Sequence, residues 1–138
     1  LTAHCLGVPI ASVSVEAAGP RCVIFDEEAV QVAGSFVDSE TTLPPLAVVA
    51  MSGFMAEAEA YGKAVGASAD LKVLSEMMLR AKPPIPAQQQ QGTTRWAALM
   101  AWTIQKKHPR AYEAVTAALI DGKGLAECLQ AAEAAERA

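Results

Sequence analysis

The stretch from Leu46 to Asp70 constrains this chain more than any other part of it. It reads LAVVAMSGFMAEAEAYGKAVGASAD, and its first half leaves almost no polar side on a helix. A helix that is apolar on most of its sides is normally buried in a core. A Pro-Pro pair precedes this helix, and Gly62 and Gly66 supply the backbone freedom that ends it. We therefore predict a core helix with defined ends, interrupted in the segment that starts at Gly53.

A second helix is expected to follow, from Ala69 to about Ala81. Ser68 is placed to cap this helix, and Asp70 lies in its first turn. The helix dipole favours an acidic side chain in a first turn by about 0.3–1 kcal/mol, which is by itself a sufficient reason for Asp70. The apolar stripe of this helix consists of Leu71, Leu74, Met77, Met78 and Leu79. We expect that stripe to pack on the core helix.

Glu57 is a carboxylate on the otherwise apolar helix. Burying a charged group without a partner is costly. We therefore expect Glu57 to accept hydrogen bonds from backbone donors, to pair with Arg21 or Arg95, or to reach the edge of a cleft. Each of these is a structural role for Glu57.

Composition limits both the size of the core and the class of partner. The chain has 138 residues, which fits one compact domain, and only 5% of them are aromatic. A net charge of −4 without a Lys-rich and Arg-rich stripe argues against nucleic-acid binding. No apolar run reaches the roughly 20 residues of a membrane span, so we expect a chain that is soluble or peripheral to a membrane. Cys5, Cys22 and Cys128 form no C-x-x-C pair, and we interpret them as reduced thiols.

The N-terminal part predicts the end of a helix followed by a β-hairpin. Residues 1–7 read as the last turns of a helix that ends at Gly7, and we expect a helical segment upstream of Leu1. Alternating apolar residues over 8–15 and 21–25 predict two strands joined by a turn. Residues 33–45 read as a surface loop with at most a brief strand at 35–37.

The C-terminal half predicts a linker and three helices. Residues 82–92 contain three prolines and a glutamine run, which favour extended backbone inside the single domain. Helices are expected over 94–107 with Thr94 as the cap, over 110–120 after Pro109, and from Leu125 onward. With the preceding elements, this predicts a mostly helical α+β domain with a small N-terminal β-hairpin beside about five helices.

Two tryptophans occupy the first of these three helices. Its expected apolar stripe consists of Trp96, Leu99, Met100, Thr103 and Ile104. Trp96 and Trp102 point to different faces of the helix, so one of them is expected to enter the core. The other, with Trp102 preferred, is expected to contact a protein partner, because Trp is enriched where one side of the ring stays wet.

Three short segments carry a resemblance to a known family: Gly53-x-x-Ala56-Glu57, Tyr61-Gly62 and Gly66-Ala67-Ser68-Ala69-Asp70-Leu71. They resemble the peptidase region of the FtsH-type zinc metallopeptidases, the M41 class. The resemblance is closest to the stand-alone versions of cyanobacteria and plant plastids, which lack the ATPase module. It implies an M41 peptidase-like fold, a plastid or cyanobacterial location, and Asp70 at the position of the third zinc ligand.

The resemblance also places the zinc-binding H-E-x-x-H motif immediately upstream of Leu1, outside this sequence. Zinc is therefore expected only together with that motif. His4 and His108 are too far apart for an i, i+4 pair and neither has a Glu beside it, so we interpret both as helix-end residues. No G-x-x-x-x-G-K-[ST] motif occurs, so ATP binding is not expected.

Three functional hypotheses follow. The first is a catalytically silent M41-like domain that serves as a structural or assembly subunit of a larger plastid or thylakoid complex, as the resemblance implies. The second is the C-terminal part of an active zinc metallopeptidase. The third is an unrelated helical interaction domain. One plausible zinc ligand in place of three favours the first hypothesis, in which the chain as it stands is not an enzyme.

Overall fold

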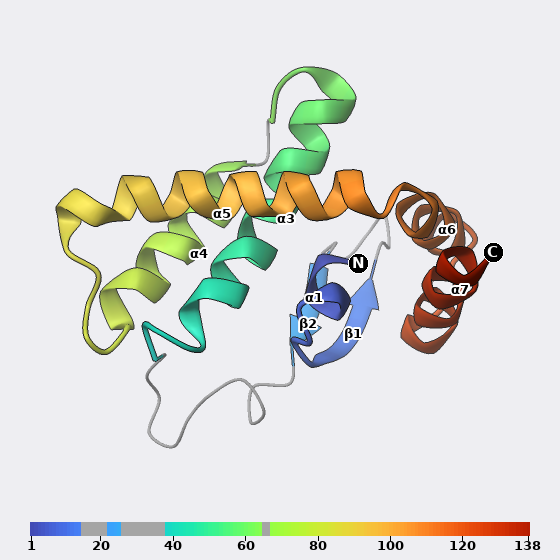
Figure 1. The fold of residues 1–138 in the computed structure, drawn as a ribbon, viewed down its shortest axis with the longest axis horizontal. Coiled ribbons are helices and arrows are strands. Elements are labelled where there is room, and N and C mark those ends of the chain that lie inside the picture. Colours follow the sequence, from blue (N-terminus) through green and yellow to red (C-terminus); the bar gives the residue numbers. More distant parts are fainter. Residues whose placement is uncertain (15–21, 26–37, 65–66) are drawn as a thin grey trace.

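The computed structural model describes residues 1–14, 22–25, 38–64 and 67–138. Within these ranges the chain forms six helices and two strands (Figure 1). In chain order they are α1 (Thr2–Cys5), β1 (Ile10–Ser14), β2 (Cys22–Phe25), α3 (Leu43–Tyr61), α4 (Ala67–Arg80), α5 (Ala87–Lys107), α6 (Pro109–Ile120) and α7 (Leu125–Arg137). The prediction of a mostly helical fold is confirmed, with six described helices in place of about five.

The long helix α5 organises the arrangement in space. It lies across α3 and α4, and α1 packs against both α3 and α5 (Figure 1). The α6–α7 hairpin lies at the C-terminal end of α5, and its two helices pack mainly against each other. No helix in the described part of the chain is both long and apolar enough to cross a membrane.

The two strands form the predicted antiparallel hairpin. Ile10 lies opposite Phe25 and Ser14 lies opposite Cys22, with an irregularity in the register between Ile10 and Ser12. The turn that joins the strands falls outside the described residues, as does the brief strand predicted at 35–37. Gly7, with a φ of 69°, ends the turn after α1 as predicted.

The core forms where α3 faces α5. Leu43, Val48 and Met51 of α3 are almost completely buried, and they meet Ala97 and Ala101 of α5, which are buried to the same degree. Alanine at both positions of α5 lets the two helix backbones approach closely, so that the large side chains of α3 fill the interface. The same cluster contains Ala47, Leu74, Met78 and Ala81.

The apolar stripe predicted for α5 is right only in part, because Met100 and Ile104 are half-buried against the core whereas its other members are exposed. Ala97 and Ala101 face the core, whereas Trp96 and Leu99 are exposed. Close packing leaves no space for large α5 side chains between the two backbones, so the small residues turn inward. The stripe predicted for α4 is right only in part. Leu74 and Met78 are buried and Met77 is half-buried. Leu71 and Leu79 are exposed.

Helix α3 begins three residues earlier than predicted. It starts at Leu43, with both prolines in its first turn, where their missing N–H groups are not needed. Asp38 organises the turn ahead of it: Oδ1 accepts the backbone N–H of Glu40 at 2.9 Å and of Thr41 at 2.8 Å. Its carbonyl oxygen accepts the N–H of Leu43 at 2.9 Å. These bonds connect the preceding turn to the start of the helix.

Helix α3 also runs without a break through Gly53, so the interruption predicted there is wrong. A single glycine costs about 1 kcal/mol relative to alanine in a helix, and tertiary burial of the surrounding helix outweighs that cost. The end of the helix is as predicted, because Gly62 has a φ of 75° in the left-handed region. Gly66 lies outside the described residues.

The starts of α4 and α5 differ from prediction. Helix α4 already begins at Ala67, so Ser68 lies within its first turn and is not its N-cap. Helix α5 begins at Ala87 after Pro86, so the glutamine run is helical and the non-helical part of the linker shrinks to residues 82–86. Glutamine is a good helix former, which explains why the run continues the helix.

Thr94 is consequently an interior residue of α5 and not its cap. Its hydroxyl donates a hydrogen bond to the carbonyl oxygen of Gln90, one turn earlier, at 2.9 Å. The later boundaries are predicted closely: Pro109 is the first residue of α6, and α7 begins at Leu125 after the turn over residues 121–124.

We expect Ala101→Leu to lower the free energy of unfolding by about 1–3 kcal/mol, because the added carbon atoms have to enter an interface without space for them. Urea unfolding followed by circular dichroism measures the loss. Ala117→Leu makes the same change on the exposed side of α6 and should alter the free energy by less than about 0.5 kcal/mol. Equal losses in the two variants would show that α3 and α5 are not closely packed.

Candidate functional site

The packing of α4 on α3 places the Asp70 carboxylate next to Gly53. Asp70 is in the first turn of α4 and is half-buried. A Cβ atom added to Gly53 would lie 3.5 Å from Asp70 Oδ2, which is ordinary van der Waals contact. The absence of a side chain at Gly53 therefore leaves open surface of α3 directly beside this carboxylate.

Glu57 lies one turn after Gly53 on α3, close enough to Asp70 to influence the ionisation of its carboxyl group. Burial raises the pKa of Asp70 above its ordinary value, and the nearby carboxylate of Glu57 raises it further. Glu57 is itself half-buried. The structure thus brings Gly53, Glu57 and Asp70 together, three of the residues that the sequence singled out. A carboxyl group whose charge is disfavoured by burial and by a neighbouring carboxylate is a common feature of functional sites.

A cavity of about 280 Å³ adjoins Gly53 from the side of the N-terminus and the C-terminal hairpin. Most of its lining is aliphatic, with side chains from α1, β1, α3, α6 and α7: Leu1, Ile10, Val13, Val49, Val115, Leu119, Leu125 and Leu129. Ser52 and Gln105 are among its polar residues, and Gln105 Nε2 donates a hydrogen bond to the carbonyl oxygen of Ser52 at 2.9 Å. The cavity therefore has an apolar lining with a polar margin near Gly53.

The zinc expectation can be compared with the donor set around Asp70. Within the described ranges, no group of three or more His, Cys, Asp or Glu side chains is arranged to hold a metal ion. Asp70 and Glu57 supply two carboxylates, whereas a catalytic zinc takes three protein ligands. These residues do not fit a zinc ion by themselves. Asp70 would become a ligand only together with groups that the structure does not describe.

A second candidate site is the outer face of α5, which we define as Trp96, Leu99 and Trp102. These side chains are 43%, 59% and 39% exposed, so the prediction that one tryptophan enters the core is wrong. They follow each other at intervals of three residues and form one oblique row on the helix. Lys106 Nζ lies 5.9 Å from the centre of the Trp102 ring and also forms an ion pair with Glu59 of α3. Trp102 is therefore held in place by a charged neighbour.

The surroundings of Trp96 are hollow. A depression of about 430 Å³ lies beside it, and its lining comes from the turn before α3, the start of α3 and the segment around α5's first turns: Ser39, Leu43, Pro44, Ile85, Gly92 and Thr93. Parts of the 33–45 loop and of the predicted 82–92 linker thus border the outer face of α5. A pocket beside an exposed aromatic ring is typical of a surface that receives an apolar side chain.

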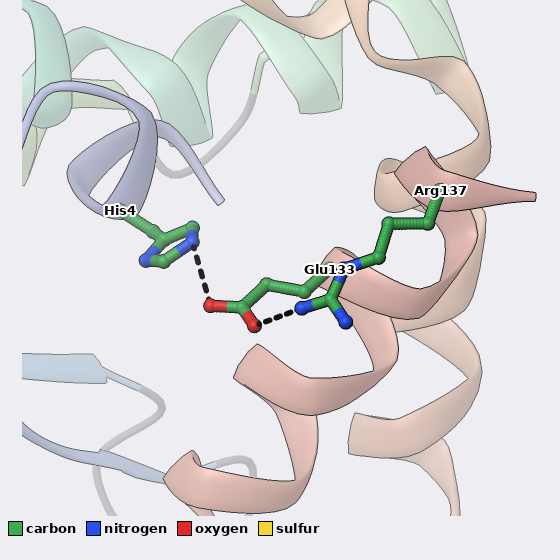
Figure 2. A network of polar contacts seen from close by, with 3 residues as sticks. All are labelled: His4, Glu133 and Arg137. Carbon is green, nitrogen blue, oxygen red and sulfur yellow. Dashed lines mark hydrogen bonds and ion pairs between the residues drawn. The ribbon is translucent and has the colours of Figure 1, made fainter.

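Sequence reasoning missed a polar cluster that joins the two ends of the chain. His4 Nε2 lies 3.9 Å from Glu133 Oε1, and Glu133 Oε2 accepts a hydrogen bond from Arg137 Nη2 at 3.1 Å (Figure 2). His108 Nδ1 lies 3.1 Å from Glu136 Oε2. Both histidines were predicted to serve helix ends, and the structure pairs each of them with α7 in addition. Only the i, i+4 spacing of Glu133 and Arg137 was visible in the sequence.

Comparison with known proteins does not assign the chain to a family. No family model matches it, no characterised protein matches it in sequence, and no solved structure matches it. Two of the three sequence segments singled out above, those that contain Gly53 and Asp70, meet at the contact of Gly53, Glu57 and Asp70.

Asp70→Asn is expected to raise the midpoint of thermal unfolding at pH 7 by about 1–3 °C. A raised pKa means that the folded state disfavours the ionised carboxyl group, so ionised Asp70 costs stability above its folded pKa. The cost vanishes below the unfolded value near 3.9, where both states are protonated. Melts at pH 7 and pH 3 check this. Glu57→Gln should give a smaller gain, because burial is the larger cause. A lower midpoint for Asp70→Asn at pH 7 would show that the folded state does not disfavour the ionised carboxyl group of Asp70.

Asp38→Asn is the matched control, and it should change the stability of the fold in the opposite direction to Asp70→Asn. The backbone N–H groups of Thr41 and Glu40, with the Thr41 hydroxyl, hold the pKa of Asp38 below its ordinary value. Ionised Asp38 therefore stabilises the folded state above the unfolded pKa, and this contribution is lost as the pH falls through the folded pKa. The variant should melt at a lower temperature than the parent at pH 7 and no differently at pH 2.

Proposed function

We propose that this chain is a catalytically silent relative of the M41 peptidases that serves as a structural or assembly subunit of a larger protein complex. The observation that carries the proposal is the outer face of α5. Three large apolar side chains are exposed in one row there, on the helix whose opposite side forms the core. Aromatic residues in such a patch are the anchors that dominate protein interfaces.

The setting of the patch supports docking. Isolated exposed apolar residues are normal on any protein, whereas a contiguous group beside a depression is typical of an interaction site. The 430 Å³ depression next to Trp96 supplies the pocket, and the ion pair of Lys106 with Glu59 supplies a polar rim beside Trp102. In this proposal the partner is a protein with an apolar surface, in the plastid or cyanobacterial setting that the resemblance implies.

The docking proposal predicts the size of the native protein. In a mild extract it should elute in a complex much larger than its own 14.4 kDa. Leu99→Gln combined with Trp102→Gln should release the chain as a monomer, because both anchors are removed while glutamine preserves helix propensity. Size-exclusion chromatography of tagged variants checks this, with circular dichroism to establish folding.

Ile120→Gln is the control for that experiment, since Ile120 is 79% exposed and lies on α6, away from the outer face of α5. It should leave the complex intact. A monomeric parent protein, or release of the chain by Ile120→Gln to the same extent, would overturn the docking proposal.

The second candidate function is that of a zinc hydrolase to which this chain contributes Asp70. The contact between Asp70 and Gly53 favours it, because a half-buried carboxylate with a raised pKa beside open helix surface is disfavoured unless a cation neutralises it. The remaining ligands and the general base would have to come from groups that the structure does not describe.

Metal analysis separates the two candidates. We expect the purified 138-residue chain, dialysed against excess Zn²⁺ and then against buffer, to retain well below one equivalent of zinc, because a single site with two carboxylates binds weakly. Asp70→Ala should leave the residual zinc unchanged. One equivalent of zinc in the parent chain that is lost in Asp70→Ala would instead favour the hydrolase.

A further inference from the structure

We propose that the outer face of α5 binds the same face of a second copy of this chain, so that two α5 helices pair antiparallel about a two-fold axis at Leu99. This inference rests on the docking proposal and names its partner. Trp96 and Trp102 lie three residues before and three residues after Leu99, so the exposed row has the same spacing in both directions. A two-fold interface joins one patch to its own copy, and a row that is symmetric about its centre suits such an interface.

The charges of α5 select the antiparallel direction. The helix contains no acidic residue, and its basic residues are Arg95, Lys106 and Lys107. In a parallel pair each of these cations would face its own copy. At a rise of about 1.5 Å per residue, the antiparallel pair separates Arg95 from its copy by about 12 Å along the axis, and Lys106 from its copy by about 21 Å. Both separations exceed the screening length of about 10 Å at 0.1 M salt.

In this register the Arg95 side chain of each copy meets the Trp102 ring of the other. Arg95 lies four residues before Leu99 and Trp102 three residues after it, and the helical repeat places both on the same flank of the row. The two-fold axis reverses the direction of the helix and keeps each flank opposite itself. Arg95 is exposed, so its guanidinium group is available to stack on the partly exposed indole. The dimer contains this cation–π contact twice.

The other flank brings Lys107 of one copy to the depression beside Trp96 of the other. The depression is bordered by the turn ahead of α3, which carries the carboxylates of Asp38 and Glu40. Lys82, which is paired with Asp38 through the backbone, offsets only one of these two charges. A lysine can lay its aliphatic stem along an apolar depression and keep its ammonium group at the rim. The basic end of each α5 therefore faces an acidic turn of the second copy.

The exposed apolar area predicts a weak and reversible dimer. A large aromatic side chain has about 150–250 Å² of surface, so the exposed parts of Trp96, Leu99 and Trp102 add up to about 300 Å² per copy. With the rim side chains, the two copies bury about 1,000 Å² in total, which is the lower end of the range for specific interfaces. We expect a dissociation constant of about 10–100 µM.

Sedimentation equilibrium of the purified 138-residue chain, between about 2 and 500 µM, measures this constant. The mass should rise from 14.4 kDa to twice that value and no further, because a two-fold interface is closed. Leu99→Gln should weaken the dimer at least about tenfold and Arg95→Gln about threefold, since each change is present in both copies. Ile120→Gln and Arg137→Gln make the same changes at exposed positions of α6 and α7 and should leave the constant unchanged.

Cysteine cross-linking tests the register. Both variants are made in a Cys5→Ser background, because Cys5 is an exposed thiol. Leu99→Cys should form a disulfide between two chains on oxidation, since helices 8–10 Å apart place facing Cα atoms about 4–6 Å from each other. Lys106→Cys should not, because the antiparallel pair holds the two thiols about 21 Å apart along the axis. Equal cross-linking of both variants would show a parallel pair and overturn the proposed register.

The results distinguish a failure of this inference from a failure of the docking proposal. A purified chain that stays monomeric at about 500 µM, while the native protein elutes in a large complex, excludes a second copy and leaves an unlike protein as the partner. A dimer that depends on Leu99, in extracts that contain nothing larger than the dimer, removes the larger complex and leaves the pairing of α5. Association that continues beyond two copies, or that is unaffected by Leu99→Gln, overturns the two-fold pairing.

Discussion

The close approach of α3 and α5 is the contact on which the rest of this structure depends. Ala97 and Ala101 allow it, and the large side chains of α3 fill the space that they leave. Once α5 presents alanine inward, its tryptophans have to lie outward, so the same contact that builds the core creates the exposed aromatic row. It also brings Gln105 to the backbone of Ser52, next to Gly53. The core and the exposed aromatic row are therefore consequences of one helix pairing, whereas the acidic site depends on the packing of α4 on α3.

The acidic site and the aromatic row differ in what they cost the fold. A carboxylate whose charge is disfavoured by burial and by Glu57 is a local loss of stability, which proteins normally retain only where the group has a use. The aromatic row costs little in the isolated chain but reduces its solubility. The proposed function relies on the second of these features, the aromatic row.

Local signals in the sequence were sufficient for several elements. Gly62, Pro109 and the alternating strands mark boundaries by backbone chemistry, and each acts within a few residues. The orientation of α5 was not predictable in this way, since helical periodicity assigns the larger residues to the core, and only the partner helix shows that alanine fits better. The pairing of His4 with Glu133 was equally hidden, because it joins residues 129 positions apart in the sequence through the placement of a whole hairpin. The residues of the acidic site could be named from the sequence. Their contact could not, because it depends on how α4 packs on α3.

The outward placement of both tryptophans has an optical consequence. The chain contains only two, and both belong to the outer face of α5. Its tryptophan emission therefore reports the surroundings of that face, while the aliphatic core between α3 and α5 contributes no tryptophan signal. A solvated face gives emission at long wavelength, and any molecule that covers it shifts the emission toward the blue. The protein thus has a built-in fluorophore at the surface through which it is proposed to act, and no label has to be attached to observe that surface being covered.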